Sequence, residues 1–194
     1  DNFSKELPVF ISQTSITKPG FINFKIKNKY FQDQIKTILI KNENYGKGNY
    51  GDGKTANVEF VSANPTGPLT IGHGRNAILG DVVSNILEWQ GYKVTREYYF
   101  NDAGRQMRIL GQSVKARYDE LLGNKFSFPD DGYQGAYINN NEKKILNEKD
   151  KKNNLDLSDF TKYAEKSIFK EIKISLKNLG ITFDTFTNEK TFYE

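Results

Sequence analysis

The only histidine of the 194-residue chain, His73, lies in the segment SANPTGPLTIGHGRN, residues 62–76. The segment also holds two of the five prolines and three of the 16 glycines. An imidazole can donate a hydrogen bond to a phosphate oxygen, and its ordinary pKa of about 6.5 lets small environmental shifts set its charge. Gly72 and Gly74 leave room for a ligand to approach the backbone. The segment is therefore a candidate phosphate site; the alternative is a histidine with a structural or surface role.

The residues on either side of this segment predict a strand, a loop and a helix. Residues 57–61, NVEFV, form a short apolar run that is typical of a buried parallel strand. Residues 75–91 carry apolar side chains at helical spacing and end at a glycine. In open parallel sheets, ligands bind at the carboxyl ends of strands, and a helix N-terminus there carries about half a positive charge. We therefore expect a nucleotide to bind at residues 62–76.

The rest of the chain predicts an α/β fold with a parallel sheet, preceded by part of a small α+β domain. After the first strand and helix, a strand at 92–100, the loop NDAG and a helix at 105–122 complete a βαβα unit. A helix at 159–180 and a strand at 181–186 follow a polar stretch. The expected parts are the α+β domain at 1–45, a linker at 46–56, the βαβα unit at 57–122, an insertion at 123–158 and the truncated continuation at 159–194.

The glycine-rich stretch NYGKGNYGDGK contains a formal G-x-G-x-x-G at Gly46, Gly48 and Gly51. A dinucleotide-binding fingerprint requires a strand before it and a helix after it. Here a strand comes after it, so we interpret the stretch as a linker.

Composition excludes several kinds of site. The chain has no cysteine, which excludes disulfides, thiolate metal sites and a cysteine nucleophile, and one histidine excludes a histidine-rich metal site. No apolar run approaches the roughly 20 residues of a membrane span, so we expect a cytoplasmic protein without membrane contact. The net charge of +4 has two interpretations. It either attracts phosphate or only reflects a composition with 23 lysines, five arginines and 20 asparagines.

The segment SANPTGPLTIGHGRNA resembles the HIGH signature of the class I aminoacyl-tRNA synthetases, in the version found in arginyl-tRNA synthetases. Other stretches resemble that family in the same order along the chain: KPGFINFKI, NVEFV, TREYYFNDAGRQM, FPDDGYQGAYI and GITFDTFTNEKTFYE. The resemblance covers most of the chain. It implies a partial Rossmann-like parallel sheet, the nucleotide-binding fold of the class I enzymes, and identifies the chain as an N-terminal piece of such an enzyme.

The resemblance implies an arginine–tRNA ligase, which activates arginine with ATP and Mg²⁺ to arginyl-adenylate and then transfers the arginyl group to tRNA. The full enzyme is expected to be a monomer without a tightly bound cofactor. Catalytic roles fall on His73 and Thr70. The implied ATP-binding residues are Asn64, Pro65, Thr66, Gly67, Pro68, Leu69, Ile71, Gly72, His73 and Asn76. The implied arginine-binding residues are Glu59, Ser62, Asn64, Asp102 and Gln106. A carboxylate such as Glu59 suits a cationic substrate; its alternative is a solvent-facing edge position.

The chain departs from the family pattern in two ways. Thr70 stands where the signature has its first histidine, and a hydroxyl is shorter and carries no charge. The sequence also lacks a K-M-S-K-S-like segment, the second half of the nucleotide-binding fold and a helical anticodon-binding domain. We therefore expect no aminoacylation by this chain alone. Two alternatives remain: another nucleotidyl transferase with a HIGH signature, and a non-catalytic RNA-binding module.

Overall fold

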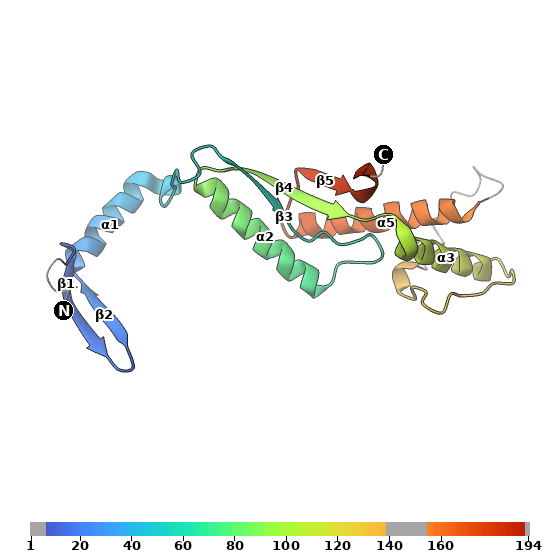
Figure 1. Ribbon diagram of the computed structural model, residues 1–194, viewed down its shortest axis with the longest axis horizontal. Helices are drawn as coiled ribbons and strands as arrows, with labels where there is room; N and C mark the ends of the chain where they lie inside the picture. The colour runs from blue at the N-terminus through green and yellow to red at the C-terminus, as the bar shows by residue number, and fades with distance from the viewer. Residues whose placement is uncertain (1–6, 139–154, 193–194) are drawn as a thin grey trace. The chain divides into compact units, whose positions relative to one another are not determined.

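The computed structural model describes residues 7–138 and 155–192, which divide after Gly48 into two compact units (Figure 1). In the first unit, β1 (Ile11–Thr17) pairs antiparallel with β2 (Phe21–Ile26), and α1 (Asn28–Lys41) and a short 3-10 turn (Asn42–Asn44) follow. The helix and the strand pair together form a small α+β unit. The sequence had not predicted β1, because ISQTSIT is too polar to show a buried face.

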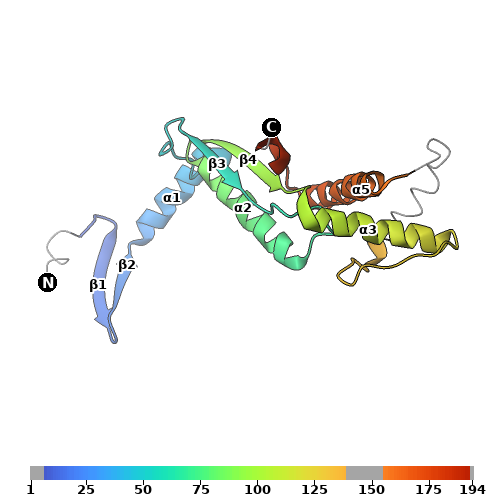
Figure 2. The same cartoon turned by 45° about the vertical axis from the view of Figure 1, so that its right-hand side comes forward.

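The second unit is built on a three-stranded parallel sheet (Figures 1 and 2). Its strands lie in the order β3 (Thr55–Glu59), β4 (Lys93–Phe100) and β5 (Thr185–Asn188). The helices are α2 (Ile71–Trp89), α3 (Gly104–Leu121) and α5 (Leu157–Asn178), and a 3-10 turn, η3 (Glu189–Phe192), follows β5. This parallel arrangement confirms the α/β fold. Within the described residues every helix is too short or too polar to cross a bilayer.

The core of the second unit lies between α3, α5 and the sheet. The two helices run side by side in both views (Figures 1 and 2). They pack closely because Gly111 of α3 faces Thr161 of α5, where a Cβ would lie 2.0 Å from the threonine Oγ1. Tyr98 is fully buried in an aromatic cluster with Phe169 and Phe186. These contacts fix the positions of α3 and β4 relative to α5.

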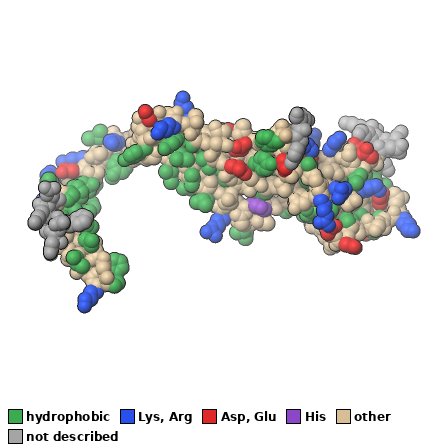
Figure 3. Space-filling view, in the orientation of Figure 1, with side chains coloured by type: hydrophobic (Ala, Val, Ile, Leu, Met, Phe, Trp, Pro, Cys, Tyr) green, Lys and Arg blue, Asp and Glu red, His purple; other side chains and the backbone are tan. Residues whose placement is uncertain are grey.

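Small residues place α2 against the sheet. Its buried positions are Ala77, Gly80 and Ser84, and a Cβ on Gly80 would lie 2.1 Å from the ring of Phe60. The close approach brings the N-terminus of α2 to the end of β3. The larger apolar side chains of α2 are exposed and follow the helix as a green band in Figure 3; they are Ile78, Leu79, Val82, Val83, Ile86 and Trp89.

Several element boundaries differ from the sequence-based expectation. Helix α2 begins at Ile71, not beyond Gly74, because Thr70 caps it. The third strand covers 185–188, not 181–186, since its pairing with β4 starts opposite Glu97. Part of the expected linker is attached to the second unit: Gly51 N–H donates to the carbonyl oxygen of residue 90 at 2.8 Å. Residues 139–154 of the expected insertion lie outside the described residues.

Candidate functional site

The chain leaves β3 through two consecutive residues in the left-handed region, Val61 (φ 65°) and Ser62 (φ 44°). A positive φ is unusual for any non-glycine residue and is an outlier for a β-branched one. Two hydrogen bonds hold this turn. Val61 N–H donates to Asn76 Oδ1 at 2.5 Å, and Tyr99 N–H donates to Ser62 Oγ at 3.1 Å. Ser62 and Asn76, both expected at the site, therefore hold the turn that leads from β3 into the loop.

Tyr98 holds the next residue of the loop. Its hydroxyl donates to the carbonyl oxygen of Ala63 at 2.8 Å and accepts from Ala63 N–H at 3.2 Å. Burial raises the pKa of Tyr98 to about 12, and the bond to Ala63 opposes that rise. The phenol is therefore neutral at physiological pH, and its O–H remains available to donate to the Ala63 carbonyl oxygen.

Asn64 and Gln106 lie in contact, as the expected arginine-binding set requires. Asn64 Nδ2 donates to Gln106 Oε1 at 3.1 Å, while Asn64 Oδ1 accepts from Asn101 N–H at 2.9 Å. These bonds join the loop after β3 to the loop after β4 and to the first turn of α3. Two parallel strands thus deliver polar side chains to one edge of the sheet.

The middle of the loop is fixed by packing. The side chain of Pro65 is fully buried, and Leu69 packs against the core. Tyr137 lies over the loop: its hydroxyl donates to the carbonyl oxygen of Thr66 at 2.9 Å and sits 3.2 Å from where a Cβ on Gly67 would be. The remaining expected ATP-binding positions, Pro68, Ile71 and Gly72, are exposed.

Thr70 and His73 form the N-terminal cap of α2. The Thr70 hydroxyl accepts from His73 N–H at 3.4 Å, and His73 Nδ1 accepts from Thr70 N–H at 3.0 Å. His73 thereby takes the place that Glu or Gln usually has in a capping box. Because Nδ1 accepts, a neutral ring carries its proton on Nε2 and presents that N–H as a donor. The half-buried imidazole reaches the surface in Figure 3 (purple).

Glu59 is exposed at the end of β3 and lies opposite Glu97 of β4 in the sheet register. Glu97 accepts hydrogen bonds from Thr187 and Asn57, and these bonds lower its pKa. A carboxylate therefore stays ionised beside Glu59. The pair gives this edge of the sheet a negative potential that suits a cationic ligand.

Asp102 has different hydrogen-bond partners from Asn64 and Gln106. Its side chain, about 5% exposed, accepts from Lys190 Nζ at 2.6 Å and from Asn188 Nδ2 at 2.8 Å. Burial tends to raise the pKa of Asp102, but the bonds from Lys190 and Asn188 outweigh burial and hold it below the ordinary value. Asp102 thus ties the loop after β4 to β5 and η3.

The cavity beside Asp102, of about 420 Å³, also contains Glu165 of α5, together with Arg108 and Lys162. Burial, and then the negative charge of Asp102, raise the pKa of Glu165 to about 6. The Oδ1 atom of Asp102 is buried and accepts no hydrogen bond from the described residues. A hydrogen bond between protonated Glu165 and Asp102 contributes to the same rise in the pKa of Glu165.

Sequence reasoning missed three residues that shape the site: Tyr98, Asn101 and Tyr137. Each acts through one or two bonds to a loop 35 to 71 residues away in the chain. Only the inward position of Tyr98 in the alternating strand pattern could have indicated it. The described part of the chain contains no group of three or more His, Cys, Asp or Glu side chains that could hold a metal ion.

Comparison with known proteins decides the family. The family described as "tRNA synthetases class I (R), catalytic domain" matches residues 34–190. The chain belongs to this class I (R) synthetase family. A partial Rossmann-like fold, expected from the resemblance, is thereby confirmed.

Curated relatives of this synthetase chain include the arginine–tRNA ligases of Desulfotalea psychrophila (47% identical) and Chlorobium phaeobacteroides strain BS1 (50% identical). Each alignment covers 95% of this chain and 34% of the relative. The chain therefore spans about a third of the length of these proteins.

Solved structures agree. A Campylobacter jejuni structure assigned as an arginyl-tRNA synthetase has a TM-score of 0.75 and 29% identity, and the match covers 87% of this chain and 38% of that one. The arginyl-tRNA synthetase of Plasmodium falciparum shares the fold, with a TM-score of 0.56 at 20% identity over 97% of this chain and 34% of that one.

Proposed function

We propose that the chain supplies the first half of the catalytic site of an arginine–tRNA ligase. The complete enzyme would activate arginine with ATP to arginyl-adenylate and then pass the arginyl group to tRNA. ATP is expected to arrive as its Mg²⁺ complex, with the ion bound to phosphates and not to a protein cage. A cytoplasmic monomer is the form in which we expect that enzyme.

The observation that carries the proposal is the bond between Asn64 and Gln106. It brings the loop after β3 and the start of α3 together at the strand ends. A substrate held there lies at the edge of the sheet where parallel α/β folds bind their ligands. Glu59 at the end of β3 and Glu97, opposite it within β4, supply negative charge on this part of the sheet.

The residues have distinct tasks in the proposed adenylation. The Nε2–H of His73 and the backbone N–H groups at the start of α2 would hold the phosphates and stabilise charge that develops at the α-phosphate. Asn64 and Glu59 would hold the amino acid. The carboxylate of arginine attacks the α-phosphate and pyrophosphate leaves, so the protein supplies positioning and charge stabilisation without a nucleophile of its own.

Ligand binding by the chain tests the proposal. ATP and arginine should each bind, as measured by calorimetry. His73→Gln should weaken ATP binding at least several-fold and leave arginine binding unchanged, whereas Asn64→Ala should weaken arginine binding at least several-fold. Asn85→Ala, on the outer part of α2, is a matched control. If neither ATP nor arginine binds while the chain still binds RNA, the result would favour the non-catalytic RNA-binding alternative.

A second measurement concerns activity. We expect no arginine-dependent pyrophosphate exchange by the 194-residue chain, because it carries no K-M-S-K-S-like segment. Detectable exchange would show that this half of the site is sufficient and would overturn that expectation.

A further inference from the structure

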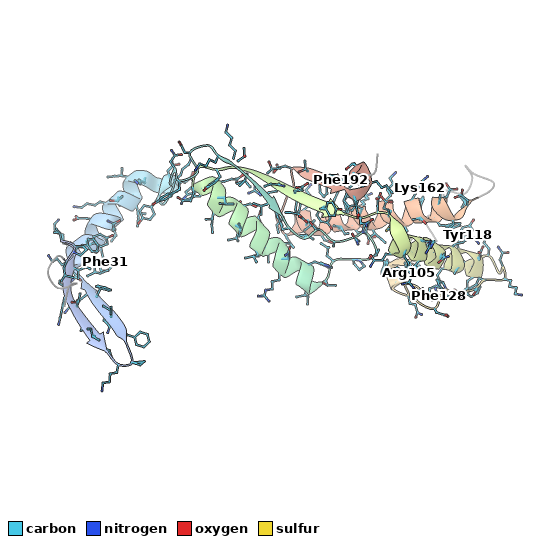
Figure 4. All side chains as sticks on the ribbon, viewed as in Figure 1. Phe31, Arg105, Tyr118, Phe128, Lys162 and Phe192 are labelled. Carbon is cyan, nitrogen blue, oxygen red and sulfur yellow. The ribbon has the colours of Figure 1, made fainter. Side chains whose placement is uncertain are left out.

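Five lysines lie on one side of α5: Lys162, Lys166, Lys170, Lys173 and Lys177. At about 100° per residue they fall within an arc of about 80°, so they form a single row along the helix. All five are exposed. This set is called the lysine row; Figure 4 labels Lys162 on α5.

The opposite side of α5 is the core face, buried at Phe160, Ala164, Ile168, Ile172 and Leu176. The row is therefore separated from the apolar side of the helix. Between Lys162 and Lys177 the acidic side chains, Glu165 and Glu171, fall outside the arc of the row, and Glu165 interacts with Asp102. The row is about 22 Å long at 1.5 Å per residue, and its members follow one another at roughly 5–6 Å.

Part of the row is held in position by aromatic rings. Lys173 Nζ lies 4.1 Å from the ring centroid of Phe186 and 4.8 Å from that of Phe169. A shallow cavity of about 530 Å³ runs between these lysines, with Phe169 and Ile174 in its lining. A cation already placed over a ring loses less side-chain freedom when a ligand binds.

We propose that the lysine row binds the phosphate backbone of tRNA, an inference that rests on the proposed function. Lysine ammonium groups bind phosphates as point charges, and a straight row of them fits a regular polyanion. A membrane surface is a poorer fit, because a helix that lies in a bilayer needs an exposed apolar side. The apolar side of α5 is buried against α3 and the sheet.

The test is tRNA binding by the 194-residue chain, measured by fluorescence anisotropy with a labelled arginine-accepting tRNA, without ATP or arginine. The lysine row is replaced by five glutamines, which retain helix propensity. The slope of log K against log salt should fall by about 3.5 to 4.5, at 0.7 to 0.9 per lost phosphate contact. The affinity at physiological salt should fall at least tenfold.

A matched control carries five Lys→Gln changes at other exposed positions, giving the same net charge: Lys18, Lys25, Lys41, Lys54 and Lys93. It should keep most of the affinity and slope. The proposal would be overturned if both variants lost tRNA affinity equally, or if the unmodified chain did not bind tRNA. It would also be overturned if replacing the lysine row weakened binding only to anionic phospholipid vesicles and not to tRNA. Failure of ATP and arginine to bind would count against the proposed function alone, since neither ligand is present in this assay.

Discussion

Replacement of Glu165 by glutamine should stabilise the chain at alkaline pH. The pKa of Glu165 rises from an ordinary 4.5 to about 6 because burial and the charge of Asp102 disfavour the ionised form. At about 1.36 kcal/mol per unit, the full shift corresponds to about 2 kcal/mol. The side chain is only half-buried, so we halve this to about 1 kcal/mol for solvent screening.

The sign follows from proton binding. The folded chain holds the Glu165 proton more tightly than the unfolded chain, so this contribution to stability is complete below pH 4.5 and is lost as pH rises through about 6. Glutamine cannot ionise. The variant should therefore exceed the parent by about 1 kcal/mol at pH 8 and by less than half of that at pH 5.

Urea unfolding at both pH values measures the difference, with fluorescence of Trp89, the only tryptophan, as the probe. Two results would refute the reasoning: a variant that is less stable than the parent at pH 8, or a stability difference that is the same at pH 5 and pH 8. Either would mean that burial and the charge of Asp102 do not disfavour the ionised form of Glu165.

Three further substitutions test how the site is held, each by urea unfolding. Thr70→Ala should lose about 1 kcal/mol of stability with the helix cap, while Thr70→Ser keeps it; equal losses would exclude the hydroxyl as the cap. Gly80→Val should cost about 1–3 kcal/mol by overpacking against Phe60, and a neutral result would show that α2 does not lie this close to the sheet. Tyr98→Phe should cost about 1–3 kcal/mol by leaving Ala63 unpaired and should also weaken ligand binding by calorimetry, whereas unchanged binding would separate this bond from the site.

The sequence predicted the parallel fold because the fold depends on local patterns, and the location of the site stays a prediction drawn from the same patterns. Apolar runs marked β3 and β4, and the glycines and prolines of residues 62–76 marked the turn between strand and helix. The start of α2 was placed too late, since glycines at 72 and 74 suggested a loop. The cap formed by Thr70 and His73 outweighs the poor helix propensity of Gly72 and Gly74.

The partners of the site residues could not be predicted, because they are distant in the chain. Asp102 was expected beside arginine, but its bonds go to Asn188 and Lys190, 86 and 88 residues later. Its contact with arginine stays a prediction. Composition left both interpretations of the positive charge open, and the helical arrangement of α5 shows five lysines on one side.

The left-handed turn at Val61 and Ser62 has a consequence for the order of folding. Its supporting bonds connect residues 15 and 37 positions apart, and the next residues of the loop depend on bonds across 35 and 42 positions. Such a conformation costs free energy, and it persists only when the surroundings impose it. On a nascent chain, the loop after β3 therefore has no stable shape until β4 and the start of α3 have been synthesised and paired. The geometry of the proposed site therefore forms late in assembly, and a substitution in β4 can abolish it without touching the loop's own residues.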